Sequence, residues 1–315
     1  MSKKIALIAI GGNALLKEKE KGLQEEQLEN ARECAEMFGN VIKAGYSLCI
    51  VHGNGPQVGN ILIQQDEGAN RIPPYTLDIC DAMTQGSMGY IIERMLINRL
   101  AYQQLNTPVT TVLTEVVVDK DDAGFVNPTK PVGPFYKEFR ALELIKEKGW
   151  HMKEDAGRGW RKVVPSPKPL EIVPLEAIKL LLGAGHCVIA GGGGGIPVIR
   201  DASGFLVGVE AVIDKDRLSS LLAEQLGADT YVILTGVPKV ALNFGKPTQR
   251  WVDRMTVTEA TKHMADGQFP AGSMGPKIEA ALNFIKAGGQ EVLITSPEAL
   301  EKEDYAQVGT RIVCD

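Results

Sequence analysis

Three short apolar segments of this chain each end abruptly in glycine. Ala6–Ile10 is followed by Gly-Gly-Asn, Leu48–Val51 by His-Gly-Asn-Gly, and Cys187–Ala190 by five consecutive glycines. An apolar run that glycine terminates is typical of a buried strand in a parallel sheet. Glycine past the carboxyl end of a strand lets backbone N–H groups approach a ligand. Because ligands of open α/β sheets bind at these strand ends, the three turns together predict a site for an anion such as phosphate.

Composition bounds the class of protein. The chain has 315 residues, 44% of them hydrophobic, which is enough for one large α/β unit or two lobes without disulfide or metal support. Its formal net charge of −5 lacks the basic field that is typical of nucleic-acid binding. The five cysteines and four histidines show no metal-ligand spacing, so we expect no metal held directly by side chains. No apolar run reaches the length of a membrane span or a signal peptide, and we expect a cytoplasmic protein with no membrane partner.

Apolar periodicity predicts that strands and helices alternate. In the first half we expect strands at 6–10 and 46–51, helices at 24–44, 57–65 and 81–104, and one β-branched strand at Val109–Val118. The alternation restarts with a helix at 175–182 and a strand at 187–190, and continues to a strand at 291–295. This order predicts an α/β fold with a doubly wound, mostly parallel central sheet sandwiched by helices.

The amino-acid composition and the apolar periodicity change in the middle of the chain. Residues 119–169 are rich in Pro, Gly, Lys and Trp and show little periodicity apart from 139–148. A stretch of this length without a regular core pattern is usually functional or separately packed. We therefore expect a small protruding lid subdomain at 119–165, an N-terminal lobe made of 1–118 and 166–186, and a C-terminal lobe at 187–315. The halves are expected to share one sheet or a tight interface.

Three lysines stand in settings that suit an anion site. Lys215 lies between Asp214 and Asp216, after an apolar run and before a predicted helix, although helix capping by an aspartate with an incidental ion pair is an equal interpretation. Lys277 lies in the first turn of a predicted helix, where a cation opposes the helix dipole unless an anion sits between them. Lys130 is flanked by proline, and alone it would be read as an exposed lysine. Together they suit phosphoryl transfer, in which positioning and charge stabilisation do most of the work.

Familiar nucleotide signatures are absent. The chain has no Gly-x-x-x-x-Gly-Lys-Ser/Thr and no protein-kinase motif set. The glycines at 53, 55 and 59 resemble a relaxed dinucleotide fingerprint, with Asp78 at the distance of its acidic residue. That pattern lies on the second strand–helix turn and its third glycine is displaced, so it supports an NAD(P)-binding oxidoreductase only weakly.

Longer motifs give a more specific resemblance. Ala-x-Gly-Gly-Asn-Ala at 9–14, His-Gly-Asn-Gly-Pro-Gln-Val-Gly at 52–59 and Asn-Pro-Thr-Lys-Pro-Val-Gly-Pro-Phe-Tyr at 127–136 resemble the carbamate kinases of the amino-acid kinase superfamily. So do Glu-Asp-Ala-Gly-Arg-Gly-Trp-Arg at 154–161, Val-Val-Pro-Ser-Pro at 163–167, Ala-Val-Ile-Asp-Lys-Asp at 211–216 and Gly-Ser-Met-Gly-Pro-Lys at 272–277. The resemblance runs essentially end to end, with order and spacing intact.

This resemblance implies reversible phosphoryl transfer between ATP and carbamate with Mg2+, which in this family usually makes ATP from ADP and carbamoyl phosphate in fermentative arginine or related catabolism. It also implies a homodimer. The residues that match the family's catalytic groups are Lys130, Lys215, Asp216 and Lys277, and the loops around the substrate match Gly11, Gly12, Asn13, Gly53, Asn54 and Gly55. We assign nucleotide binding to Asp214, Gly272, Ser273, Met274 and Gly275.

Two departures and three alternatives accompany this interpretation. Gly236 stands where many relatives of the superfamily have aspartate, and Gly192 stands where several have a small polar residue, so either could alter nucleotide or Mg2+ affinity. Another superfamily enzyme that phosphorylates a small carboxylate is one alternative, and the lid motif together with Ile10 in place of a lysine argues against it. An NAD(P)-binding oxidoreductase and a non-catalytic nucleotide sensor are the others.

Overall fold

In a computed structural model of the chain, the described residues are 3–11, 15–17, 20–155, 157, 159–270, 273–302 and 308–315. Among them, eight strands form the main sheet in the order β15-β17-β16-β12-β1-β2-β9-β3. All neighbouring pairs are parallel except β16 and β17. Their bounds are β1 Ile5–Ile10, β2 Ser47–His52, β3 Val109–Thr111, β9 Cys187–Ile189, β12 Thr230–Leu234, β15 Arg254–Thr256, β16 Glu291–Thr295 and β17 Thr310–Val313. The expected mostly parallel sheet is confirmed, and it spans both halves of the chain.

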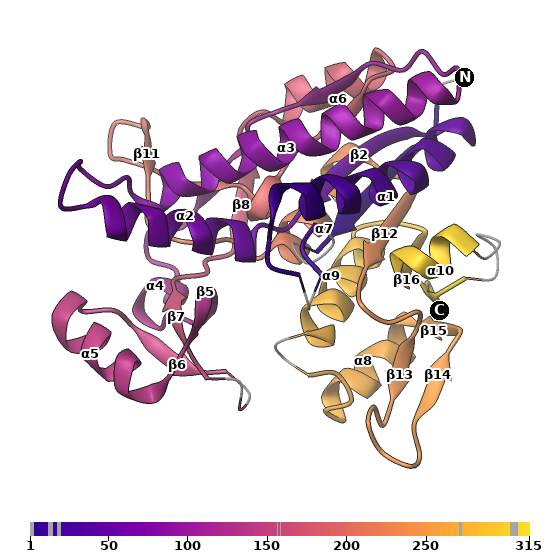
Figure 1. The fold of residues 1–315 in the computed structure, drawn as a ribbon. Helices are drawn as coiled ribbons and strands as arrows, with labels where there is room; N and C mark the ends of the chain where they lie inside the picture. The colour runs from indigo at the N-terminus through magenta and orange to yellow at the C-terminus, as the bar shows by residue number, and fades with distance from the viewer. Residues whose placement is uncertain are drawn as a thin grey trace.

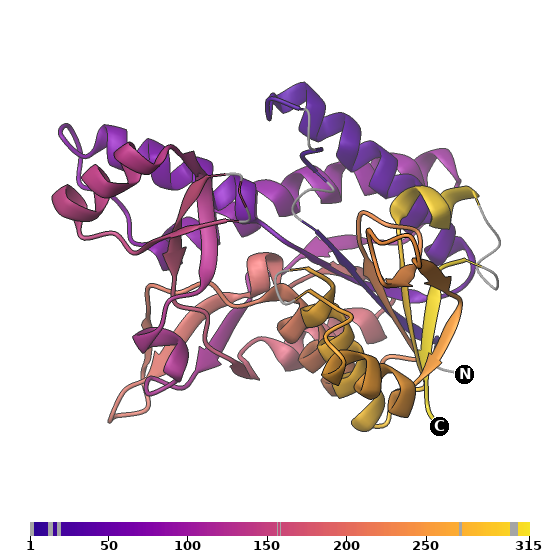
Figure 2. The ribbon, with the colours of Figure 1, turned by 90° about the horizontal axis from the view of Figure 1, so that it is seen from below.

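Alternation along β1 explains why helices cover both faces of this sheet. Leu7 and Ala9 belong to one buried cluster, whereas Ile8 and Ile10 belong to another, because successive side chains of a strand point to opposite faces. The first cluster includes residues of α6, α7, α8 and α9, and the second includes residues of α1 and α3. In Figure 2 the indigo and purple helices lie above the sheet and the orange and gold helices below it. These helices are α1 Gln24–Lys43, α3 Leu77–Tyr102, α6 Leu175–Gly183, α7 Lys215–Leu226, α8 Val257–Ala265 and α9 Met274–Lys286.

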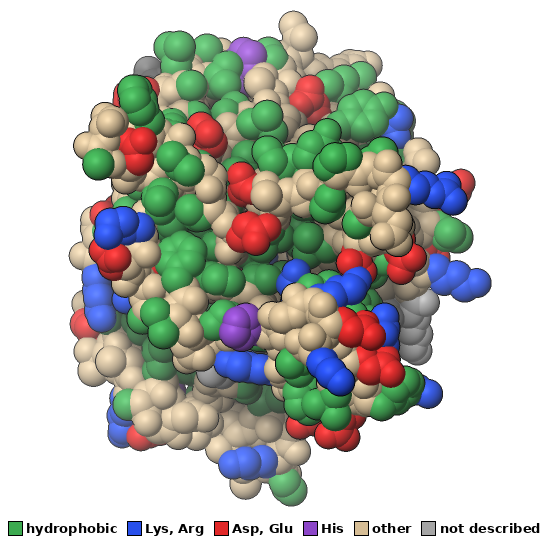
Figure 3. Space-filling model, turned by 90° about the vertical axis from the view of Figure 1, so that its left-hand side faces the viewer, with side chains coloured by type: hydrophobic (Ala, Val, Ile, Leu, Met, Phe, Trp, Pro, Cys, Tyr) green, Lys and Arg blue, Asp and Glu red, His purple; other side chains and the backbone are tan. Residues whose placement is uncertain are grey.

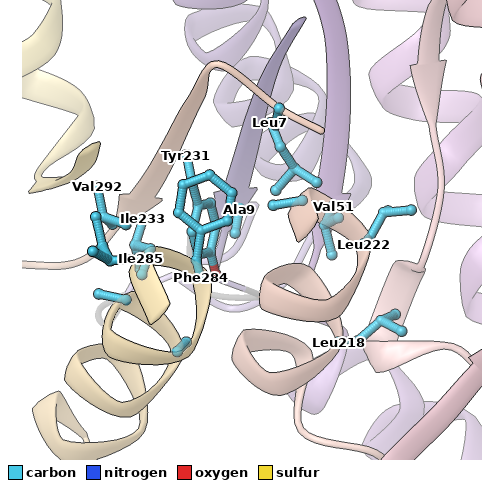
Figure 4. Packing of buried hydrophobic residues seen from close by; sticks show 14 of the residues in the cluster. Leu7, Ala9, Val51, Leu218, Leu222, Tyr231, Ile233, Phe284, Ile285 and Val292 are labelled. Carbon is cyan, nitrogen blue, oxygen red and sulfur yellow. The ribbon is translucent and has the colours of Figure 1, made fainter. Parts of the chain in front are cut away.

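Figure 4 shows how closely the core between the sheet and α9 is packed. Tyr231 of β12 meets Phe284 of α9 edge to face, with ring centroids 5.5 Å apart. Both side chains are buried. Aromatic pairs in this geometry add stability beyond the area that they bury. The pair therefore fixes α9, which carries Lys277, against the central strands.

A second, four-stranded sheet runs in the order β11-β10-β4-β8, with bounds β4 Glu115–Val118, β8 Pro169–Ile172, β10 Ile196–Arg200 and β11 Leu206–Gly208. The prediction of one strand over Val109–Val118 is wrong, because the segment divides between the two sheets. β3 pairs with β9, and β4 pairs with β10. Between them the chain changes direction at Thr114, a buried residue whose hydroxyl donates to the Val112 carbonyl, 2.8 Å away.

The middle segment forms a separate small layer that protrudes below α2 (Gly55–Gly68) in Figure 1. Its three-stranded sheet has the order β5-β7-β6 and a short core of Ala141, Leu144 and Met152. Val132 and Val164 of this layer pack with Val58 of α2, which joins the layer to the body. Its elements are α4 Ala123–Val126, β5 Lys130–Tyr136, α5 Glu138–Lys148, β6 Met152–Glu154 and β7 Trp160–Val164.

The remaining elements are short. They are the 3-10 turn η2 Gly192–Gly194, the hairpin of β13 Val240–Leu242 and β14 Arg250–Val252, and α10 Pro297–Lys302. Within the described part of the chain, no helix combines the length and apolar character that crossing a bilayer requires.

Candidate active site

The carboxyl ends of four neighbouring parallel strands border one cleft of about 630 Å³. Gly11 follows β1, Gly53 and Gly55 follow β2, Gly193 follows β9 and Thr235 follows β12, and all of them line it. Such an edge is where open α/β sheets bind ligands. The three glycine turns found in the sequence therefore do meet at one place.

Asp216 joins two of the predicted lysines. Its carboxylate is buried, and it accepts from Lys215 Nζ and from Lys277 Nζ, the latter at 2.9 Å. Lys277 reaches it because α9 packs against α7, where Ser220 Oγ donates to the Ala280 carbonyl at 2.9 Å. Burial opposes ionisation of Asp216, but the charges of both lysines outweigh it and lower the pKa of that carboxyl. Asp216 is thus an anion that holds two ammonium groups at the cleft.

Asp214 joins the third lysine to the same helix. Its Oδ1 accepts from the backbone N–H of Asp216 at 2.9 Å and so caps the start of α7, while its Oδ2 accepts from Lys130 Nζ at 2.7 Å. Burial opposes ionisation here too, and the Lys130 charge and hydrogen bond hold the pKa of Asp214 well below its usual range. Helix capping and the ion pair, which the sequence left as alternatives, are both present.

The cluster carries one more positive than negative charge, and all three lysines line the cleft. Burial, followed by the neighbouring charge of Lys215, lowers the pKa of Lys277, against the pull of Asp216. A cation that the protein alone solvates poorly gains most when an anionic group arrives. The arrangement can neutralise the charge that develops on a transferred phosphoryl group.

Asn54 lines the cleft, but its amide nitrogen points away from the substrate space. Its Nδ2 donates to Asp81 Oδ1 at 2.9 Å and to Thr84 Oγ1 at 2.8 Å, both on α3. His52 beside it is fully enclosed, its Nδ1 lies 3.1 Å from the Gly53 carbonyl, and burial lowers its pKa to about 4. The neutral imidazole therefore has a structural role beside the turn that follows β2.

The glycine run Gly191–Gly195 is shaped by packing as much as by exposure. A Cβ on Gly192 would lie 2.4 Å from His52 Nε2, and one on Gly194 would lie 2.2 Å from the Ile213 carbonyl oxygen. A side chain at 192, such as the small polar residue of several relatives, would therefore displace His52, and within this run Gly193 is the glycine that lines the cleft.

Other predicted site residues are placed less completely. Gly12 and Asn13, predicted for the substrate loop, and Gly272, predicted for the nucleotide, lie outside the described residues. Ser273 precedes α9 and is exposed, Met274 packs against the core, and Gly275 N–H donates to the Pro270 carbonyl at 2.9 Å. These three do not line the cleft as described, so their assignment to the nucleotide stays a prediction.

Two cleft cations were missed by the sequence reasoning, Arg161 and Lys17. Arg161 Nε donates to the Gly133 carbonyl at 3.1 Å, and its guanidinium carbon lies 5.2 Å from the Phe135 ring centroid. The motif at 154–161 contains Arg161 and could have signalled it. Lys17 donates to Glu33 Oε2 at 2.6 Å, both residues line the cleft, and no motif quoted above covers Lys17.

Fold and site together define an α/β enzyme of the phosphoryl-transfer type that works without a P-loop. The model of the Amino acid kinase family matches residues 4–296, and the chain belongs to that family. Its relatives include carbamate kinase from Thermococcus kodakarensis, 47% identical over 98% of this chain and 99% of the relative, and carbamate kinase from Pyrococcus furiosus, 46% identical over 99% and 100%. The solved carbamate kinase of Giardia lamblia bound to AMP-PNP is 42% identical, covers 99% of both chains and superposes with a TM-score of 0.91. The resemblance expected from the motifs is confirmed.

Proposed function

We propose that this chain catalyses ATP + carbamate ⇌ ADP + carbamoyl phosphate. The observation that carries the proposal is the convergence of Lys130, Lys215 and Lys277 on one cleft, in a chain that is 47% identical to a carbamate kinase over nearly its whole length. A carbamate oxygen attacks the γ-phosphorus of ATP, the bond from that phosphorus to the β–γ bridging oxygen breaks, and ADP leaves with the electron pair. The reverse direction makes ATP.

The lysines stabilise the charge on the moving phosphoryl group. We assign the Gly11 and Gly53–Gly55 turns to the carbamoyl end and the residues around Thr235 and α9 to the nucleotide. Mg2+ enters as MgATP or MgADP, held by phosphate oxygens. The two carboxylates nearest the lysines, Asp214 and Asp216, are each paired with lysine, and the described residues contain no cluster of three His, Cys, Asp or Glu side chains suited to a metal.

Residues 119–165 are proposed to act as a lid. Lys130 extends from this layer to Asp214 of the body, and the carbamoyl group is small enough that a covering element would be needed to exclude water from it. The division of the rest of the chain into an N-terminal lobe at 1–118 and 166–186 and a C-terminal lobe at 187–315 is likewise a proposal.

A homodimer through α3 and β11 is also proposed. Exposed apolar side chains recur along one face of α3, and the β11 hairpin carries further exposed apolar side chains. This hairpin lies beside the start of α3, because a Cβ on Gly208 would meet the Asp78 carboxylate. Figure 3, which shows the left-hand side of the molecule in Figure 1, has hydrophobic side chains gathered over the upper part of that side. A second copy would cover a patch of this kind. The members are Ile79, Met83, Tyr90 and Ile97 on α3, and Phe205, Leu206 and Val207.

ATP formation by the purified protein from MgADP and carbamoyl phosphate tests the activity directly. For specificity, carbamate is compared with acetylglutamate or another small carboxylate, each with MgATP, in one assay that is coupled to ADP formation. Turnover with carbamate that is at least a hundredfold above the comparison substrates is expected. Absence of ATP formation by folded protein would refute the proposal, and a preference for another carboxylate would transfer it within the family. Light scattering of the chain and of a Tyr90→Lys variant tests the dimer, which is expected to dissociate in the variant.

A further inference from the structure

Three polar side chains at one end of α3 are buried behind the cleft. Asp81, Thr84 and Gln85 are each no more than 2% exposed, and their spacing puts them on one side of the helix. Polar groups lose free energy on burial unless they are hydrogen-bonded. Their partners are therefore informative, and the two sets of bonds lead to two different turns of the cleft.

Gln85 holds the glycine run that follows β9. Its Oε1 accepts from the Thr114 N–H at 2.8 Å, and its Nε2 donates to the Gly192 carbonyl at 2.9 Å. Thr114 Oγ1 in turn accepts from the Gly191 N–H at 2.8 Å. One carboxamide and one hydroxyl thus fix two successive residues of the run.

Asp81 and Thr84 hold the turn that follows β2, through the two bonds to Asn54 Nδ2. Thr84 Oγ1 also donates to the Asp81 carbonyl at 2.7 Å. Asp81 Oδ2 has no hydrogen-bond partner among the described groups, and burial raises the pKa of this carboxyl well above its ordinary value. Burial thus favours the neutral form of Asp81, and the α3 network holds the Asn54 side chain in place.

The turn after β2, the glycine run after β9 and the start of α7 are tightly packed against one another. A Cβ on Gly193 would lie 2.4 Å from Asn54 Nδ2. A Cβ on Gly194 would lie 2.2 Å from the Ile213 carbonyl oxygen and 3.2 Å from the Lys215 backbone nitrogen. Because protein interiors are close-packed, a shift of the glycine run would displace both the Asn54 side chain and the backbone of Lys215.

From this geometry we infer that Gln85 is a positioning residue for phosphoryl transfer, which sets the separation between the Asn54 turn and Lys215 by holding Gly192. The inference rests on the proposed function. Gln85 touches neither the cleft nor a lysine, so its effect passes through backbone placement. A displacement of about 1 Å at a reacting group can cost on the order of 100-fold in rate.

The test uses Gln85→Met, which keeps the length of the side chain and removes its hydrogen bonds to the Thr114 backbone and to the Gly192 carbonyl. The second variant is Thr114→Val, which keeps the shape and removes the bond to Gly191 from the other side. Both are expected to lower kcat at least tenfold while the Kd for MgADP stays within twofold. Amide hydrogen exchange in 191–195 is expected to accelerate in both variants, a readout that does not depend on activity. The second variant decides if the first does not fold.

Glu93→Ala is the matched control. Glu93 lies two turns further along α3 and accepts from the Thr111 N–H at 2.9 Å, the same kind of bond to a neighbouring strand without a link to the glycine run. It is expected to lose stability while keeping kcat within twofold and exchange in 191–195 unchanged. The inference is overturned if folded Gln85→Met and Thr114→Val turn over normally, if the control loses as much kcat, or if MgADP affinity falls in parallel. Failure of the proposed function shows instead as an inactive wild type, and the exchange measurement then decides about Gln85.

Discussion

Lys130 donates to Asp214 at 2.7 Å, although 84 residues of sequence separate them. The bond joins the protruding layer to the residue that caps α7, and α7 begins with Lys215. The Lys130 ammonium is about one-third exposed, so the pair contributes little to stability and much to geometry. Its position makes the protruding layer part of the charge cluster.

Replacing Lys277 with methionine is expected to lower kcat by about 100- to 1000-fold, because it removes charge stabilisation of the transferred group and leaves Asp216 with Lys215 alone. Lys286→Met on the same helix is the control, since Lys286 is exposed at the end of α9. Steady-state kinetics with circular dichroism of both variants checks the result. Unchanged kcat in Lys277→Met and in Lys215→Met would reject the lysine cluster as the catalytic feature.

Replacing Lys130 with methionine is expected to reduce kcat about 100-fold and to change the Kd for MgADP by less than about threefold. The reason is that Lys130 belongs to the protruding layer, whereas the proposed nucleotide side lies around Thr235 and α9. Lys120→Met, which removes an exposed lysine at the start of that layer, should leave both constants unchanged. Calorimetric titration of MgADP alongside turnover separates the two effects. A Kd that rises as much as kcat falls would place Lys130 on the nucleotide instead.

Patterns among neighbouring residues predicted many of the strands and helices and the candidate lysines. Apolar alternation along β1 and glycine at the strand ends follow from neighbouring residues, and the structure confirms both. Lys215 and Lys277 were predicted from their local settings, and Lys130 from its combination with them and from the motif that contains it. Local sequence patterns do not predict the register of any pair of strands, because strand pairing depends on residues that are far apart in the sequence.

Other features depended on tertiary contacts. The segment Val109–Val118 is rich in β-branched residues along its whole length, and its division at Thr114 depends on Gln85 and Gly191, neither of which is near in sequence. Glycine is required at position 192 because His52, which lies 140 positions earlier in the sequence, occupies the space of a side chain there. Arg161 enters the cleft because its strand folds beside β5. The roles assigned to residues 12, 13 and 272 stay predictions, because these residues lie outside the described part of the chain.

The alkaline side of the pH profile is expected to report Lys277. Burial and the charge of Lys215 lower its pKa below the ordinary 10.5, and the reaction needs its charged form, so kcat/KM falls as pH rises through that lowered value. Lys277→Arg keeps the charge at high pH, because arginine does not deprotonate there. The variant is expected to have a lower plateau whose alkaline decline is shifted upward or lost. A decline at the same pH in wild type and variant would assign it to another group.

Gly59 of α2 tests whether the seating of the protruding layer matters. A Cβ there would lie 2.4 Å from Gly133 Cα, a backbone atom that cannot move aside as a side chain would. Gly59→Ala is expected to push β5 away from α2, to move Lys130, which begins β5, and to lower kcat at least tenfold. Gly68→Ala on the same helix is the control: its nearest atom would lie 4.0 Å away, and the substitution should raise stability by about 0.4–1 kcal/mol. Thermal unfolding and turnover of both variants decide: full activity in a folded Gly59→Ala enzyme would show that the contact between α2 and β5 does not position Lys130.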